Sequence, residues 1–167
     1  MQTVTKTFNI YEFDELTEDI KQKVIEREAE GIRQIEIEDF LREEMDFYAE
    51  QLLEEYFEGK AIFKNVFYSL SYCQGDGAMI EFDLKYCNKN VKIRHDKGRY
   101  YHENSFGILE EYGEELTEKQ YKQLHEKIYN INKQLTKCGY AFIEEDRTEQ
   151  AIEQLKDCMF YENGDIY

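Results

Sequence analysis

Residues 69–84 read SLSYCQGDGAMIEFDL, and this stretch decides the fold. In its second half small or apolar side chains alternate with Met79, Glu81, Asp83 and Lys85, a period of two that is typical of a strand with one buried face. A second alternation precedes the glycines and contains Val66, Tyr68, Leu70 and Tyr72. The two runs predict an antiparallel hairpin.

The length of the hairpin loop follows from which residues share the core face. A two-residue turn at Asp76 and Gly77 would place the polar Ser71 opposite Phe82 on the buried face, so the apolar residues of the two strands would not pack together. A three-residue loop, residues 75–77, is a kind that uses a left-handed glycine and a bulge. We therefore predict an odd-length loop that pairs Tyr72 with Ile80, Leu70 with Phe82 and Tyr68 with Leu84.

Further strands extend this hairpin into a sheet. Asn88 and Lys89 suit a tight turn into a strand at 91–95, in which Val91 and Ile93 continue the buried face. A turn at 96–98 leads to a further strand at 99–106, and residues 3–13 alternate in the same way. The pattern predicts an antiparallel meander of four to five strands.

Helical periodicity flanks the sheet on both sides. It predicts a helix from about residue 14 that Gly31 loosens or ends, and a second from about 37 to 57 that stops at Gly59. These two form an antiparallel acidic pair. After the sheet come a helix from Leu116 to Gly139, with a capping box at Thr117 and Gln120, and a short helix from Thr148. Without proline or linker, we expect one α+β domain over residues 1–167 with about four helices.

The composition excludes several classes of function. The 167 residues carry a formal net charge of −16, which repels nucleic acid and anionic membranes and favours basic partners. No stretch approaches 18 apolar residues, and the start lacks the features of a signal peptide, so we expect a cytoplasmic protein. Its four cysteines lack paired spacing and are expected to be buried and reduced.

The negative charge is concentrated in the predicted helical pair. Residues 12–58 hold 18 acidic and five basic residues, whereas residues 60–105 hold eight basic and five acidic ones. The acidic run is either a solvated face or a surface that replaces phosphate charge in a basic channel, and both interpretations stay open here. The candidate partner contacts are Glu43, Asp46, Glu50 and Glu54, with the hairpin loop at Gln74 and Asp76 as the competing contact.

No residue pattern indicates catalysis or a cofactor. The three histidines and four cysteines have no structural zinc spacing, and nothing in the sequence identifies a base for Cys73. The GDG turn follows a strand rather than opening a helix, so turn chemistry explains it without a phosphate. We expect a protein that is not an enzyme and that holds no metal or cofactor.

The opening residues 8–23, the segment S-x-S-x-x-Q-G-D-G-A at residues 69–78 and the close FYENGDIY resemble a group of small uncharacterised phage and mobile-element proteins. This resemblance implies a role against host defence, as in anti-CRISPR inhibitors of RNA-guided nucleases. The expected function is a phage-type inhibitor that binds a basic nucleic-acid-handling protein, most plausibly a CRISPR nuclease, and blocks nucleic-acid access. The alternative is an antitoxin-like or accessory protein-interaction module with no nuclease target. The oligomeric state is left open.

Overall fold

The computed structural model describes residues 7–113 and 115–167 and confirms the α+β class. The chain order begins with β1 (Tyr11–Glu12), the 3-10 helix η1 (Phe13–Glu15) and α1 (Glu18–Phe57). The middle holds β2 (Ala61–Ser69), β3 (Gly77–Tyr86), β4 (Lys89–His95) and β5 (Phe106–Glu110). Then follow α2 (Glu118–Glu144), α3 (Thr148–Leu155) and β6 (Met159–Phe160).

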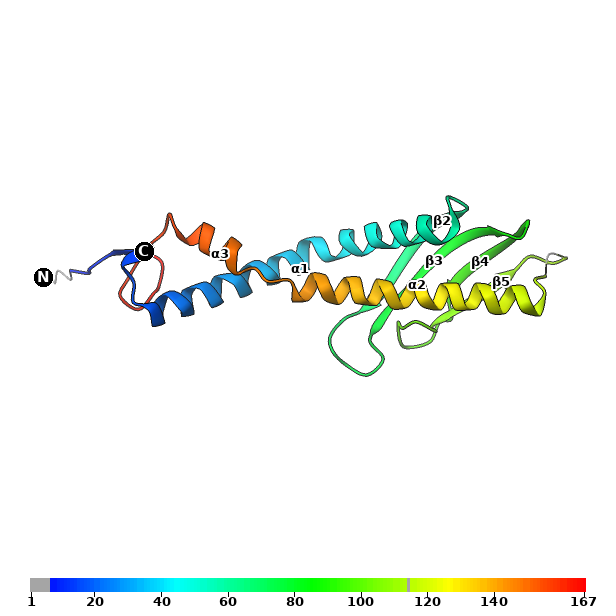
Figure 1. Ribbon diagram of the computed structural model, residues 1–167. Coiled ribbons are helices and arrows are strands. Elements are labelled where there is room, and N and C mark those ends of the chain that lie inside the picture. Colours follow the sequence, from blue (N-terminus) through cyan, green and yellow to red (C-terminus); the bar gives the residue numbers. More distant parts are fainter. Residues whose placement is uncertain (1–6, 114) are drawn as a thin grey trace, which may run out of the picture. The chain divides into compact units, whose positions relative to one another are not determined.

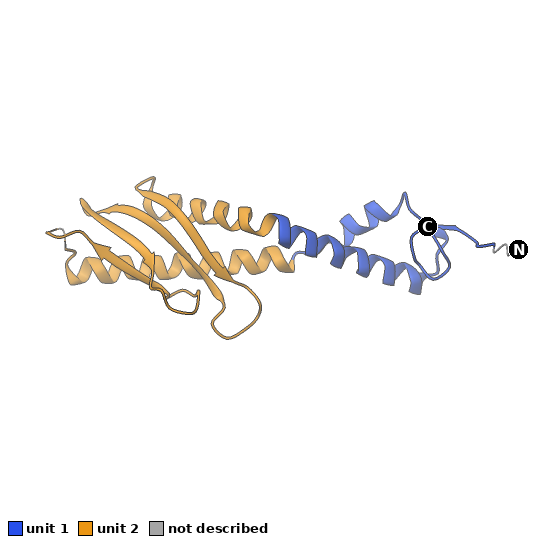
Figure 2. Ribbon diagram, turned by 180° about the vertical axis from the view of Figure 1, so that it is seen from behind, with its two compact units in different colours: residues 1–39, 145–167 blue, residues 40–144 orange. Residues whose placement is uncertain are grey.

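The contacts of the chain group into two compact units, residues 1–39 with 145–167 and residues 40–144 (Figure 2). The helix α1 supplies residues to both units, so the prediction of one domain stays a prediction. In the first unit β1 pairs with β6, and the core consists of Phe13, Leu16, Val24, Leu155 and Phe160. A buried ion pair adds to this unit, because Nε of Arg147 donates to Glu36 Oε2 at 2.8 Å.

The second unit is built on the predicted antiparallel meander, with strand order β2-β3-β4-β5. Residues 40–57 of α1 and the helix α2 cover one face of this sheet (Figure 1). Alternate residues of the two central strands point to that face and are almost fully buried: Ala78, Ile80, Phe82, Leu84, Val91 and Ile93. The buried side of α2, with Leu124, Ile128, Ile131 and Leu135, completes the core.

The predicted hairpin register is wrong, although its parity is right. Ser69 lies opposite Gly77 and Val66 opposite Ile80, while Phe63 faces Phe82 beyond a bulge. The loop therefore spans residues 70–76 instead of 75–77. Its length stays odd, so the core face is kept and Ser71 does not face Phe82. The longer loop has a local cause, the hydrogen bonds of Asp76 described below.

The predicted N-terminal helical pair is one continuous helix, α1. A glycine inside a helix costs only about 1 kcal/mol relative to alanine, and packing of both flanks overrides that cost at Gly31. The antiparallel neighbour of residues 40–57 is α2 instead. Lys127 and Gln134 of α2 donate to Tyr56, and a Cβ on Gly139 would approach Met45 Sδ within 2.9 Å.

Several boundaries also differ from the prediction. The strand expected at 3–13 is reduced to β1, with positions 3–6 outside the described residues, and the strand expected at 99–106 lies at 106–110. The helix α2 begins with the predicted capping box but continues past Gly139. The cysteines are free, yet Cys73 and Cys87 are exposed and Cys138 and Cys158 half-buried, so their predicted burial is wrong.

Candidate functional site

One exposed face of α1 combines carboxylates with aromatic rings. Phe40, Glu43, Phe47, Glu50 and Glu54 follow one another in steps of three and four residues, which places them on one side of the helix. The opposite side of the same segment is buried in the core of the second unit. We call these five residues the acidic ridge.

The two phenylalanines of the acidic ridge are the feature that sequence reasoning missed. The predicted contacts on this helix are all carboxylates, yet Phe40 is 49% exposed and Phe47 is 53% exposed. Both share the heptad spacing of Glu43 and Glu50, but this spacing does not show whether a large apolar side chain beside the core is exposed. Aromatic side chains are enriched at the centres of protein interfaces, so rings among carboxylates favour a protein-binding surface over a merely solvating one.

Asp46, the fourth predicted acidic contact, lies outside the acidic ridge. Its Oδ2 accepts a hydrogen bond of 3.2 Å from Nε of Arg42. The same guanidinium donates to the Val66 carbonyl at 2.9 Å and to the Asn65 side chain. Asp46 therefore holds the cation that ties α1 to β2, and its charge is largely compensated at that place.

Asp76 organises the hairpin loop from within. Its carboxylate accepts hydrogen bonds from the amides of Ser71 at 2.6 Å and Cys73 at 2.8 Å, and from the hydroxyls of Ser69 at 2.8 Å and Tyr140 at 3.2 Å. These bonds, that of the Cys73 amide above all, outweigh partial burial and lower the pKa of Asp76 to about 2. A carboxylate with this many donors has little capacity left for a partner.

The rest of the loop is held against its surroundings. Tyr72 has a positive φ of 58° and its ring packs on Tyr140 with centroids 4.8 Å apart, while its hydroxyl donates to Glu144. Gly75 has no room for a side chain, because a Cβ would meet the Tyr100 ring at 2.3 Å. Gln74 is exposed on this ordered loop. The acidic ridge and the loop are thus two separate surfaces.

Replacing Asp76 by asparagine is expected to destabilise the loop at neutral pH. The new amide group would point a donor at the donating amides of Ser71 and Cys73. Because the folded pKa lies below the ordinary value of about 3.9, the aspartate stabilises the protein above pH 4 and loses this effect as the pH falls towards 2. Urea unfolding of both proteins between pH 7 and pH 2.5 should show a gap between midpoints that closes on acidification. A gap that is unchanged at pH 2.5 would contradict this role.

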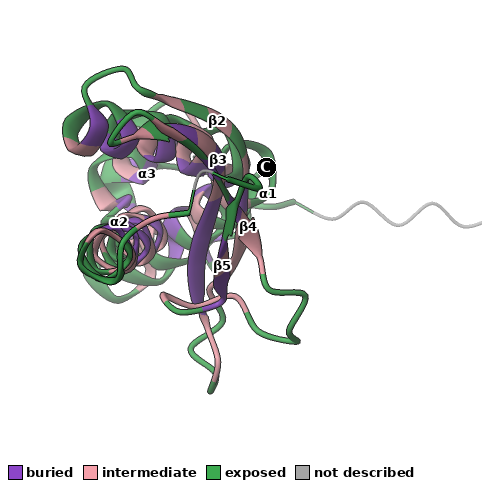
Figure 3. Ribbon diagram, turned by 90° about the vertical axis from the view of Figure 1, so that its right-hand side faces the viewer, coloured by how far each residue is buried: buried purple, intermediate pink, exposed green. Residues whose placement is uncertain are grey.

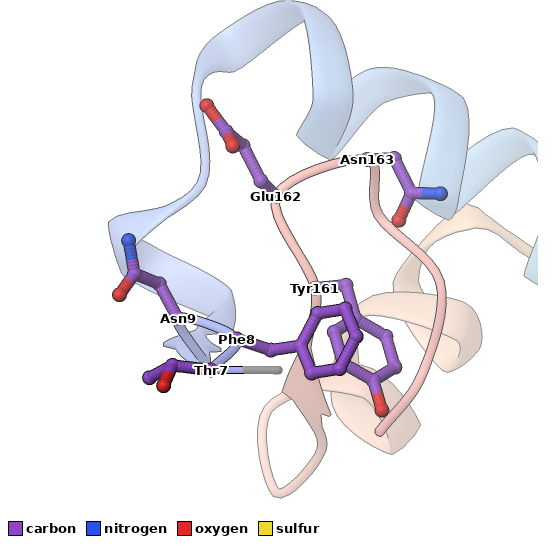
Figure 4. Close-up of a pocket in the computed structure, with 6 residues that line it drawn as sticks. All are labelled: Thr7, Phe8, Asn9, Tyr161, Glu162 and Asn163. Atoms are coloured by element: carbon purple, nitrogen blue, oxygen red, sulfur yellow. The ribbon is translucent and has the colours of Figure 1, made fainter. Parts of the chain in front are cut away.

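The structure also shows hollows outside the acidic ridge and the hairpin loop. A pocket of about 490 Å³ in the first unit is lined by Thr7, Phe8, Asn9, Tyr161, Glu162 and Asn163, with the Phe8 and Tyr161 rings in edge contact (Figure 4). Within residues 7–113 and 115–167, no three histidine, cysteine or acidic side chains group as metal ligands, and no helix is long and apolar enough to cross a membrane.

Comparison with known proteins adds no relative. No family model, no curated protein and no solved structure matches the chain.

Proposed function

We propose that this protein is a non-enzymatic inhibitor that binds a basic nucleic-acid-handling protein through the acidic ridge and blocks access of the nucleic acid. Its most specific form is a phage-type inhibitor of an RNA-guided CRISPR nuclease in the host cytoplasm. The observation that carries the proposal is the exposure of Phe40 and Phe47 among Glu43, Glu50 and Glu54 on one face of α1.

Charge density decides how such a surface would act. Glu43 and Glu54, the outer two of the three carboxylates, are 11 residue steps apart on the helix, or about 16 Å. A DNA duplex presents roughly ten charges over that length, so the acidic ridge replaces phosphate only in part. The carboxylates therefore steer a basic partner and raise the association rate, and the two phenylalanine rings supply the buried contact that slows dissociation.

The first experiment identifies the partner by pull-down from host lysate with the full chain. The proposal expects a nucleic-acid-handling protein, most specifically a nuclease complex, whose binding weakens as salt rises, because exposed charge pairs are screened beyond about 8 Å at physiological ionic strength. A partner that does not handle nucleic acid would overturn the proposal in favour of the antitoxin-like or accessory module. Binding indifferent to salt would exclude electrostatic steering.

Charge reversal then tests the acidic ridge. The triple variant Glu43→Lys, Glu50→Lys and Glu54→Lys is expected to slow association about tenfold or more in surface plasmon resonance. The matched control carries Glu126→Lys, Glu149→Lys and Glu162→Lys, exposed positions outside the acidic ridge with the same change in net charge. An equal loss of association rate in both variants would show that the effect comes from net charge and not from the acidic ridge. Full inhibition by the acidic-ridge variant would shift the contact to the loop at Gln74.

A further inference from the structure

The sheet of the second unit has one face that the helices leave open. Figure 3 shows α2 on one side of the strands, and residues 40–57 of α1 lie on that same side (Figure 1). These are the helices that the structure describes in the second unit. Side chains on the uncovered side include Ile62 and Leu109, which are 61% and 53% exposed. We call the outward-facing side of β2 to β5 the open sheet face. Exposed aliphatic side chains on two of its strands are a first sign of a contact surface.

Gly107 lies on the open sheet face, where neither its backbone conformation nor its surroundings require a glycine. It lies inside β5 opposite Arg94, its φ is not positive, and a Cβ there would meet no atom within 4 Å. A glycine in the middle of a strand weakens it and often marks the close approach of a ligand or another chain. Gly107 lines a hollow of about 570 Å³, whose other lining residues are Phe67, Glu81, Arg94, His95, Asp96, Lys97 and Leu109.

The charges of the open sheet face are mixed, and its carboxylates are already held. Glu81 accepts the amide of His95 at 2.9 Å, and Asp96 accepts that of Gly98 at 2.8 Å. Asp83 is paired with both Lys64 and Arg94. A fourth acid, Glu111, pairs with Lys92 at 3.7 Å. The cations Lys64, Lys85, Lys92, Arg94 and Lys97 outnumber these four acids by one, in keeping with the positive balance of residues 60–105.

We propose that the open sheet face binds the acidic ridge of a second copy of this chain. Phe47, with Glu43 and Glu50 one turn to either side, has the chemistry that the hollow accepts: an aromatic ring over Gly107 between Phe67 and Leu109, and carboxylates towards Arg94 and Lys97. An exposed ring on the acidic ridge of one copy would thus fill the hollow on the open sheet face of another.

The two surfaces differ, so the contact is head-to-tail and does not close on itself in a pair. Each added copy presents a further acidic ridge and a further open sheet face. We expect this association to be weak, because one aromatic ring and two carboxylates carry the contact. Self-association and binding of another basic protein then compete for the same acidic ridge.

Sedimentation velocity of the purified full chain between 10 µM and 1 mM tests this inference. The wild type is expected to show an average mass that rises with concentration beyond a dimer and falls in high salt. Gly107→Val fills the hollow with a residue that strands favour, so its urea midpoint should equal or exceed that of the wild type while association is lost. Phe47→Ser should also be monomeric, and Tyr112→Ser, which removes an exposed ring outside both surfaces, should behave as the wild type.

Mixing the two single-surface variants gives the decisive result. Gly107→Val keeps the acidic ridge and Phe47→Ser keeps the open sheet face, so an equimolar mixture should form a one-to-one dimer and nothing larger. A wild type that is monomeric over the whole range, a Gly107→Val variant that still associates, or a mixture that stays monomeric would overturn the inference. These outcomes do not depend on the proposed nuclease partner, because only the purified chain is used.

Discussion

Phe82→Ala is expected to lower the free energy of unfolding by about 3 to 5 kcal/mol. The Phe82 ring is fully buried at the centre of β3, faces Phe63 and Ile93 on the neighbouring strands, and packs on the Phe57 ring of α1 with centroids 5.5 Å apart. Truncation loses the burial of the ring and leaves a cavity between sheet and helices. Because domains are stable by only about 5 to 15 kcal/mol, this one substitution should remove a large fraction of the total.

Urea unfolding followed by circular dichroism measures this loss. The matched control is Phe47→Ala, the same substitution at an exposed position of α1, where we expect a change within about 0.5 kcal/mol. Similar losses in the two variants would mean that Phe82 is not at the centre of the core or that Phe47 is not exposed.

The buried face of the sheet could be predicted because it depends only on alternation. Ile80, Phe82 and Leu84 share a face because they alternate along one strand. Any odd loop length then places Val66 and Tyr68 of the neighbouring strand on the same face. The register could not be predicted, because it depends on Asp76. The amides of Ser71 and Cys73 donate hydrogen bonds to the Asp76 side chain. These bonds hold residues 70–76 as an ordered loop, although alternation alone assigns residues 70–72 to a strand.

The continuous helix α1 illustrates the limit of a local stop signal. Gly31 resembles a helix end in sequence, but the signal requires a left-handed conformation that Gly31 does not adopt. Ala29 and Ile32 on either side pack with Ala151 of α3, a contact about 120 residues away in the chain. Helical periodicity in the sequence does not reveal tertiary packing of this kind.

The candidate site was predictable in its charges and not in its apolar part. Glu43, Glu50 and Glu54 lie away from the buried stripe because helical spacing alone puts them there. The exposure of Phe40 and Phe47 could not be predicted, since a large apolar residue next to a buried stripe is normally assigned to the core. Asp46 differs from the other acids because its helix neighbour Arg42 ties α1 to β2. Asp76 differs because the loop amides of Ser71 and Cys73 and the Tyr140 hydroxyl bond to it.

Asn132→Leu is expected to cost about 1 to 3 kcal/mol, although leucine is the better helix former and the more apolar residue. Asn132 is fully buried on α2, where its Oδ1 accepts the amide of Ile80 at 3.1 Å and its Nδ2 donates to the Glu103 carbonyl at 3.2 Å. The pairing of β3 with β4 begins only at Phe82, so the Ile80 amide points away from β2 towards the helix. Leucine would leave a buried donor without a partner.

Two further variants separate this hydrogen bond from general effects of the helix. Thr136→Val removes the hydroxyl that accepts the Ala78 amide at 2.9 Å one turn along α2, so it should destabilise the protein by the same mechanism. Gln123→Leu makes a similar change at an exposed position of α2 and should shift stability by less than about 0.5 kcal/mol. Amide hydrogen exchange should then speed up at Ile80 in Asn132→Leu and at Ala78 in Thr136→Val. Unchanged protection at both amides would show that α2 does not satisfy this end of β3.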